Sequence, residues 1–456
     1  MGPRTLLLLA FTSSASAAER GTGVFEPWLE KLWASRTEAD ERELELRIAK
    51  GLGSKGYDKV RVSVVAPRLE AFDDFPFTYR EQFRYRWTEN FLHSALVKLN
   101  AGPNELSIGG RKVTVELPEE DTGIRGVFWA DPCFSSKWIT CRYAQRFQTF
   151  NRSVEMLNGI FKDPSMNLWG ILGDNFYDQT GELTKTFFDH ISLDVKRRFF
   201  LVVNGNHDNW VCGGPECGDA SDNFGLGQMQ YYPADAVAST LEPQDDVNFL
   251  DFSVDPDHRR EYQSFQNSGT NFLSYHKLGN IGFLSFSGAA KFEDAKPHME
   301  EACRYFEEAQ PAAVFVVGHW NSEGMGCLKD MATPEVRAEI LRLPGCRELG
   351  DRLKYMDGHK HCNYVQAHNE EPIGFMIGAH GMDDHCEAQY GFLFLDSTGG
   401  RVRLYYFEVD SATRGDRFED IRGCVESRGS LASCLYFAET WLDVPAERER
   451  GSGVLV

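Results

Sequence analysis

The chain has 456 residues, of which 42% are hydrophobic and 25% charged, and its formal net charge is −20 at neutral pH. Such a length exceeds one ordinary hydrophobic core, and the composition is typical of a globular protein with two domains or one large extended domain. The acidic surface excludes a general nucleic-acid binder, because a phosphate backbone would be repelled, but metal ions in a pocket would still attract a small phosphate ester.

The first 18 residues predict a signal peptide. Arg4 supplies the basic start, Leu6 to Phe11 form a short apolar run, and Ala15-Ser16-Ala17 is typical of a cleavage site. The alternative is an apolar start of the mature chain. No later stretch has the roughly 18 uninterrupted apolar residues of a membrane span. We therefore expect a protein without a transmembrane segment, secreted or held in the lumen of the endomembrane system.

The cysteine content agrees with an oxidising compartment. The chain has 11 cysteines, and pairs such as Cys212 with Cys217 and Cys424 with Cys434 would close short loops. The odd number leaves at least one cysteine without an intramolecular partner. A single glycosylation sequon, Asn151-Arg152-Ser153, is present, and its use stays open.

Two regions are expected before the main core. Residues 19–56 predict a helical segment, because Trp28, Leu29, Leu32 and Trp33 recur at helical spacing. Residues 57–120 predict a β-rich region, either a small sandwich or an attached sheet. Its expected strands cover 60–65, 83–87, 92–99 and a hairpin over 106–117. No catalytic cluster lies in this region, so we interpret it as a structural or positioning module.

Residues 121–410 predict an α/β catalytic core, and residues 411–456 a tail of helix and turns. In the core, apolar strands alternate with helical stretches and end in polar, glycine-containing turns. The expected strands are 126–130, 168–172, 199–203, 314–317 and 375–377, and the expected helices are 141–161 and 297–309. Active groups of such folds lie at the carboxyl ends of the strands.

Five polar clusters follow strands or turns of this core. They are Asp131, Gly173-Asp174-Asn175-Phe176-Tyr177, Asn204-Gly205-Asn206-His207-Asp208, Gly318-His319 and Gly358-His359-Lys360-His361. Two neighbouring metal ions need a carboxylate between them, imidazoles on each, and an open position for water and substrate. Glycines beside the ligands let the backbone turn sharply where a strand ends. These residue types therefore indicate a binuclear metal site.

In type and order, the five clusters resemble those of the calcineurin-like metallophosphoesterases, and within them the purple acid phosphatases of the tartrate-resistant branch. The resemblance covers roughly residues 123–410. It implies a four-layer α-β-β-α sandwich, here with a small β-rich N-terminal region. It also implies an enzyme that hydrolyses phosphate monoesters with a hydroxide bound to or bridging two metal ions.

The resemblance also assigns ligands by position. One ion, Fe(III) in that family, would be held by Asp131, Asp174, Tyr177 and His361. A second, divalent ion (Fe, Zn or Mn) would be held by Asp174, Asn206, His319 and His359, so that Asp174 is the bridge. His207 resembles the non-ligand that contacts the substrate phosphate or protonates the leaving group.

Several residues keep more than one interpretation. Cys133 stands where relatives have a glycine or a ligand histidine, so it is a thiolate ligand, a structural bystander or the partner of Cys141 in a disulfide. Tyr177 is either a metal ligand or an aromatic residue of the hydrophobic core. His380 and His385 are either substrate-binding or merely solvated loop residues, and Cys362 is expected in a disulfide or in the core.

Two other functions remain open from the sequence. A phosphodiesterase or nucleotide pyrophosphatase would use the same metal ligands, since loop shape decides how many ester arms fit. A binding protein that kept the fold without catalysis would be expected to have lost ligands. We expect a small phosphorylated substrate and no nucleic-acid partner, and the sequence does not indicate an oligomeric state.

Overall fold

The computed structural model describes most of the chain after the first 43 residues. The described ranges are 44–50, 56–66, 72, 74–77, 79–83, 90–136, 139–178, 181–208, 273–286, 292–319, 331–382 and 386–446. Among their helices, none has the length and apolar character needed to cross a membrane. The proposed signal peptide and the pair Cys212 and Cys217 lie outside these ranges.

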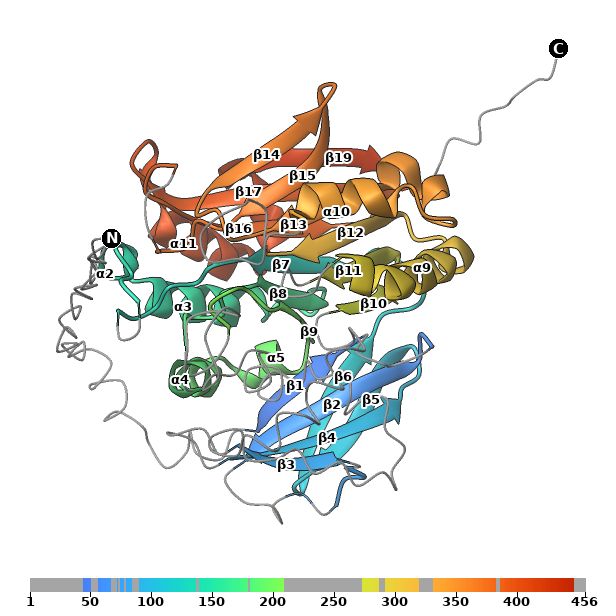
Figure 1. Cartoon of the computed structure of the whole chain (residues 1–456). Helices are drawn as coiled ribbons and strands as arrows, with labels where there is room; N and C mark the ends of the chain where they lie inside the picture. The colour runs from blue at the N-terminus through green and yellow to red at the C-terminus, as the bar shows by residue number, and fades with distance from the viewer. Residues whose placement is uncertain are drawn as a thin grey trace, which may run out of the picture.

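The larger sheet contains eleven strands within the described residues (Figure 1). They are β1 (Glu45–Ala49), β2 (Lys59–Ala66), β3 (Tyr79–Phe83), β4 (Asn90–Lys98), β7 (Arg125–Trp129), β8 (Leu168–Leu172), β9 (Phe199–Val203), β16 (Gln389–Asp396), β17 (Arg401–Ser411), β18 (Gly415–Asp416) and β19 (Glu439–Pro445). Their order is β18-β17-β16-β7-β8-β9-β1-β2-β4-β3, and β19 pairs with β17. The central strands β7, β8 and β9 run parallel.

The second sheet has six strands in the order β10-β11-β12-β13-β15-β14. Their bounds are β10 (Leu273–Leu278), β11 (Ile281–Phe286), β12 (Ala313–Gly318), β13 (Leu353–Asp357), β14 (Asn363–His368) and β15 (Glu371–Ile377). Strands β11, β12, β13 and β15 are parallel neighbours. A separate hairpin joins β5 (Gly102–Ile108) to β6 (Arg111–Leu117).

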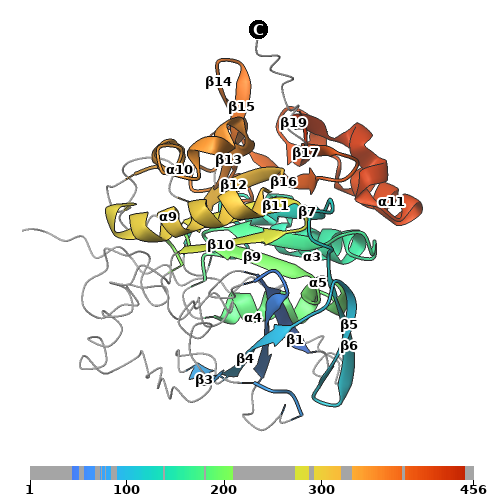
Figure 2. The same cartoon turned by 90° about the vertical axis from the view of Figure 1, so that its right-hand side faces the viewer.

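Helices cover the outer face of each sheet, as Figure 2 shows for α3 and α11 on one side and α9 and α10 on the other. The helices are α2 (Ala144–Phe147), α3 (Thr149–Ile160), α4 (Glu182–His190), α5 (Leu193–Lys196), α9 (Phe292–Ala309), α10 (Thr333–Ile340) and α11 (Phe418–Arg428), with 3-10 turns η4 (Arg347–Arg352) and η5 (Leu431–Phe437).

Three apolar cores separate these layers. Phe128 of one sheet meets Phe283 of the other with ring centroids 6.0 Å apart, in the core between the sheets. A second core packs Trp169 of β8 against Phe187 of α4, and a third contains Phe306 of α9 and Val316 of β12. Buried apolar surface on both faces of each sheet is the main stabilising term for such layers. The predicted α-β-β-α sandwich is confirmed.

The N-terminal region differs from the prediction. Residues 45–49 form a strand, not part of a helix, and β1 pairs with β2 and, through Ile48 and Phe199, with β9. All five residues of β1 are buried, and Leu46 and Ile48, two positions apart, both join the core between the sheets, as alternate residues of a strand do. Arg47 lies between them, with its guanidinium carbon 3.9 Å from the centre of the Phe188 ring. The β-rich region is thus an attachment of the larger sheet.

The C-terminal tail is also more than helix and turns. Helix α11 and turn η5 follow β17, but β19 then returns to pair antiparallel with β17, with Leu442 opposite Leu404. The predicted disulfide between Cys424 and Cys434 is present and links α11 to η5. The missed strand is short, and only Trp441 and Leu442 within it are buried.

Candidate metal centre

The polar clusters come together because parallel strands carry them to one edge of both sheets. Asp131 follows β7, Tyr177 follows β8, and Asn206 follows β9 in the larger sheet. His319 follows β12, and His361 follows β13 in the smaller sheet. Backbone hydrogen bonds connect these strand ends: Ala130 N–H donates to Ile377 O at 3.2 Å, and Asp131 N–H donates to Gly173 O at 3.1 Å.

Several site residues have left-handed backbone conformations. The φ angles are 54° at Asp131, 49° at Asp174, 51° at Tyr177 and 77° at His359. Residues other than glycine rarely adopt this backbone conformation, and such conformations concentrate at functional sites. The turn at each strand end thereby aims its side chain inward.

Glycines let the turns pack directly against the carboxylates. A Cβ atom added to Gly358 would lie 2.6 Å from Oδ2 of Asp131, and one added to Gly205 would overlap the side chain and backbone nitrogen of Asp174. Each position therefore tolerates only glycine without movement of its neighbours. At both positions the backbone therefore approaches a carboxylate more closely than a residue with a side chain would allow.

One group of donor atoms contains Asp131, Tyr177 and His361. The Tyr177 hydroxyl donates to Oδ1 of Asp131 at 3.0 Å and lies 2.9 Å from Nε2 of His361. The distance from that Nε2 to Oδ1 of Asp131 is 3.5 Å. A carboxylate, a phenol and an imidazole thus point at a common centre, and all three side chains are buried.

A second group contains Asp174, Asn206, His319 and His359. Nε2 of His319 is 3.3 Å from Oδ2 of Asp174, and Nδ1 of His359 is 3.1 Å from Oδ1 of Asn206. The His319 and His359 ring centroids are 5.3 Å apart. Nε2 of His319 also lies 3.6 Å from Oδ1 of Asp131, which joins the two groups.

The tautomer of His319 favours metal binding. Its Nδ1 lies 2.8 Å from the carbonyl oxygen of Leu172, so Nδ1 carries the hydrogen and donates it. Nε2 then faces the two carboxylates and is the ring nitrogen available to a metal ion. A second hydrogen bond of this kind is the usual means by which proteins orient a ligand histidine.

The site demands positive charge. Asp131 and Asp174 are almost completely buried, and no lysine or arginine among the described residues pairs with either. Burial opposes a charge on His319, but Asp174 and Asp131 outweigh it and raise the pKa of His319 to about 10. Burial opposes ionisation of Asp174 too, yet His319 and His207 hold its pKa below the usual range. A buried carboxylate pair needs such compensation, and metal cations fit this donor set.

His207 lies at the edge of the cluster instead of within it. Its backbone N–H donates to Oδ1 of Asp174 at 2.8 Å, while its ring is partly exposed and 5.2 Å from the Tyr177 ring. The partly exposed ring could contact a bound molecule, while the main chain supports the carboxylate of Asp174.

Asp208 supports the candidate site, although sequence reasoning gave it no role. Its carboxylate accepts hydrogen bonds from the backbone N–H of Asn175 at 2.7 Å, the Asn175 amide at 2.7 Å and the N–H of Gly205 at 2.6 Å. Burial and the charge of Asp174 raise the pKa of Asp208 to about 8. Asp208 ties the loop after β8 to the loop after β9. Its place in the cluster that also contains Asn206 and His207 was the available signal.

Cys133 is bonded to Cys141, so the structural interpretation of Cys133 is the correct one and the thiolate-ligand interpretation is wrong. Cys362 is bonded to Cys386, as expected for a disulfide or core residue, and Cys303 to Cys346. With Cys424 and Cys434, four disulfides occur in the described residues. Such a set is typical of proteins from an oxidising compartment.

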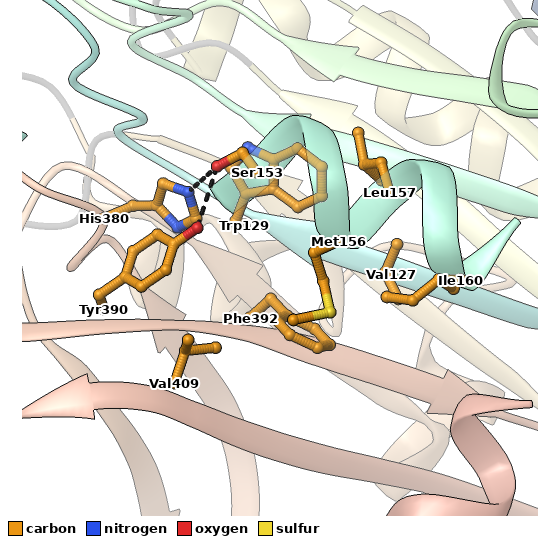
Figure 3. Close-up of a pocket in the computed structure, with 10 residues that line it drawn as sticks. All are labelled: Val127, Trp129, Ser153, Met156, Leu157, Ile160, His380, Tyr390, Phe392 and Val409. Atoms are coloured by element: carbon orange, nitrogen blue, oxygen red, sulfur yellow. Dashed lines mark hydrogen bonds between the residues drawn. The ribbon is translucent and has the colours of Figure 1, made fainter. Parts of the chain in front are cut away.

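His380 is not a solvated loop residue, and its ring does not face the carboxylates. It lines a small cavity between the larger sheet and α3, where it points toward Ser153 and Tyr390 (Figure 3). Its Nε2 is 2.9 Å from Oγ of Ser153 and its Nδ1 is 3.0 Å from Gly391 O. Burial lowers the pKa of His380 to about 3. The substrate-binding prediction for His380 is therefore wrong, because its hydrogen bonds are internal. His385 lies outside the described residues.

Comparison with known proteins finds similarity only among solved structures. No protein-family model matches the chain, and no curated protein matches it. A purple acid phosphatase isolated from yellow lupin (Lupinus luteus) seeds is 12% identical over 82% of this chain and 72% of its own, with a TM-score of 0.45. A dimetal phosphatase from Danio rerio is 9% identical over 62% and 95%, with a TM-score of 0.37.

A mutant of Vps29 from Entamoeba histolytica is 11% identical over 63% of this chain and 93% of its own, with a TM-score of 0.27. At this level of similarity the chemistry of the chain has to be argued from its own residues.

Proposed function

We propose that the chain is a metal-dependent hydrolase of phosphate monoesters, with an acid phosphatase-like binuclear centre. The observation that carries the proposal is the convergence of two donor groups at one edge of the sandwich. Asp131, Tyr177 and His361 form one group, and His319, which lies between Asp131 and Asp174, connects it to the other. Asp131 and Asp174 are buried, and within the described residues no lysine or arginine pairs with either carboxylate, which favours cations.

Each donor group would hold one ion, with Asp174 shared. Asp131, Tyr177 and His361 would complete the first site, and we propose Fe(III) there, because a phenolate oxygen suits a hard, highly charged ion. The second site would use Asn206, His319 and His359 and take divalent Fe, Zn or Mn. Two bound ions would supply Lewis acidity for the phosphoryl oxygens and lower the pKa of water near the ester.

His207 would contact the substrate directly. Its ring is the partly exposed imidazole beside the cluster, and the hydrogen bond from its backbone to Asp174 keeps it there. In the protonated form it would donate a hydrogen bond to a phosphoryl oxygen, or give its proton to the departing alcohol oxygen as the ester bond breaks. Asp208 would fix the position of the loop after β8 relative to the loop after β9 without touching substrate.

The cellular setting follows from the cysteines. Four disulfides in the described residues favour an oxidising compartment. We propose secretion or retention in the lumen of the endomembrane system, with a small phosphorylated molecule as substrate.

The decisive experiment combines metal analysis with a substrate panel. Purified protein is expected to contain two metal ions per chain and to hydrolyse p-nitrophenyl phosphate faster than bis-p-nitrophenyl phosphate, ATP or ADP-ribose. The Asp174→Ala variant should lose metal and turnover together, because the shared carboxylate compensates both cations. Preference for the diester or for nucleotides would establish a phosphodiesterase or pyrophosphatase instead. Two bound metals without turnover would indicate a binding protein, and an Asp174→Ala variant with both metals and full rate would refute the proposal.

A further inference from the structure

Tyr177 belongs to an apolar cluster that contains a disulfide. Its ring belongs to a small buried cluster with Cys133, Cys141, Ala144 and Met382 that is separate from the three large cores. Cys133 and Cys141 are bonded to each other, and Cys133 lies two residues after Asp131. Two of the three residues of one donor group are therefore near this disulfide, Tyr177 in the same cluster and Asp131 two residues away in the chain.

A second disulfide stands beside the third member of that group. Cys362 directly follows His361 and is bonded to Cys386, 24 residues later in the chain. Cys362 is fully buried, and its carbonyl oxygen accepts a hydrogen bond from Gly378 N–H at 2.9 Å. The turn that carries His361 is thus attached to the chain that follows β15.

Residues 378–382, which we call the clasp, connect the two disulfides. On one side, Ala379 N–H donates to Oδ1 of Asn363 at 3.1 Å, next to Cys362. On the other side, Cys133 N–H donates to the carbonyl oxygen of His380 at 3.2 Å. Arg142 N–H donates to the carbonyl oxygen of Met382 at 2.7 Å. A Cβ added to Gly378 would lie 2.8 Å from Oδ2 of Asp131.

The other donor group has a different support. Asp174 and Asn206 are positioned by the hydrogen bonds of Asp208 to Asn175 and Gly205, and His319 by its bond to Leu172 O. Among the described cysteines, none follows Asp174, Asn206 or His319 within its loop. Within the described residues, the disulfides beside the centre lie at its tyrosine-containing half.

We propose that the disulfides Cys133–Cys141 and Cys362–Cys386, joined by the clasp, are positioning elements for the tyrosine half of the metal centre. They fix the spacing of Asp131, Tyr177 and His361 and so set the affinity of that half for its ion. Supporting groups of this kind typically change metal affinity by about 10- to 100-fold. The inference rests on the proposed binuclear centre.

The test compares three paired variants with the wild-type protein. Cys133→Ala with Cys141→Ala removes the first brace, and Cys362→Ala with Cys386→Ala removes the second. Cys424→Ala with Cys434→Ala is the control, because its disulfide spans 10 residues and that of Cys133 and Cys141 spans 8, so loss of either frees a similar amount of chain entropy. Each protein is dialysed against a chelator, and metal content, ultraviolet absorption of ionised tyrosine and the Tm of the metal-depleted protein are measured.

We expect the control to keep two metals after dialysis, and its metal-depleted form to lose Tm to an extent similar to that of the first brace variant. Each brace variant should fall toward one metal per chain, with at least about 10-fold weaker binding of the lost ion and a smaller ionised-tyrosine signal. Brace variants that hold both ions as tightly as the wild type would overturn this inference but not the proposed function. Equal metal loss in the control would have the same consequence. A wild-type chain without two metals would contradict the proposed function, and the inference with it.

Discussion

The hydroxyl of Tyr177 donates a hydrogen bond of 3.0 Å to Oδ1 of Asp131, although 46 residues separate the two in the chain. The same oxygen is 2.9 Å from Nε2 of His361. Tyr177 therefore bridges the ends of β7 and β13 from its own place after β8. A core aromatic would need only its ring for packing, whereas here the polar end of the side chain meets two potential metal ligands.

Replacement of Tyr177 by Phe tests the phenol. If the oxygen binds Fe(III), the wild-type protein should have a visible absorption band from phenolate-to-metal charge transfer, and Tyr177→Phe should lose it. The ring contacts with the Cys133–Cys141 cluster would persist, so Tm of the metal-depleted protein should change little. Turnover should fall less than for Asp174→Ala, because three protein ligands remain on that ion. Visible spectra and metal analysis provide the measurement.

Tyr436→Phe is the matched control, since Tyr436 is 70% exposed on η5 and its loss should leave the spectrum unchanged. A colourless wild-type protein that is active and fully loaded with zinc or manganese would contradict the Fe(III) assignment. The broader proposal of a binuclear phosphoesterase would still stand in that case.

His207→Ala separates substrate contact from metal binding. The side chain is not part of either donor group, and its backbone N–H to Asp174 survives the substitution. We expect two metals per chain and a fall in kcat of roughly 100-fold or more, as is typical when a general acid is lost. His368→Ala, an exposed histidine on β14, should be indistinguishable from wild type. Metal loss in His207→Ala would make His207 a ligand and refute its assigned role.

The site could be anticipated from sequence because each of its parts is local. Asp174 and Tyr177 follow a five-residue apolar strand within a single turn, and β8 spans residues 168–172 as predicted. Because the carboxyl ends of parallel strands lie at one edge of a sheet, such turns are expected to lie close together. Asp208 was overlooked because its partners, Asn175 and Gly205, are recognisable only once the two loops are side by side.

The N-terminal strand and His380 could not be anticipated for the opposite reason. The sequence around Glu45 and Arg47 is typical of a charged helix. In the structure Arg47 is buried, where it forms an ion pair with Glu45 and lies over the ring of Phe188. Both the ring contact and the pairing with β9 are long-range. His380 lies in a glycine-containing turn typical of exposed loops, yet its ring stacks against Trp129 with centroids 5.8 Å apart. Tertiary burial overrode local pattern in both cases.

Buried histidines predict a loss of stability in acid. Burial lowers the pKa of His276 and of His380 to about 3 each, from an ordinary value near 6.5. Below pH 6.5 the unfolded chain takes up protons that the folded chain refuses, so the free energy of unfolding should decrease from pH 6.5 toward pH 3. Tm measured from pH 7 to pH 4 should fall less steeply for His380→Gln than for wild type, although His380→Gln starts lower. Parallel curves would show that His380 contributes nothing to the slope.

The close contact of Gly205 with Asp174 gives a prediction about backbone space. In Gly205→Ala the new methyl group would overlap Oδ1 and the backbone nitrogen of Asp174 and lie 2.8 Å from Cδ2 of His319. None of these atoms is the free end of a flexible side chain, so the loop after β9 has to move. We expect a destabilisation of about 1–3 kcal/mol, as for other overpacked positions, together with weaker metal retention.

The control for this substitution is Gly423→Ala. Gly423 lies inside α11 with no atom within 4 Å of an added Cβ, and alanine is the better helix former by about 1 kcal/mol. Gly423→Ala should therefore raise Tm slightly and keep both metals. Urea unfolding of the metal-free proteins measures the packing cost, and metal content after dialysis measures the effect on the site. If Gly205→Ala matched the control in both measurements, the glycine would not be required where the loop approaches Asp174, and the proposed close packing of this loop against the carboxylate would be wrong.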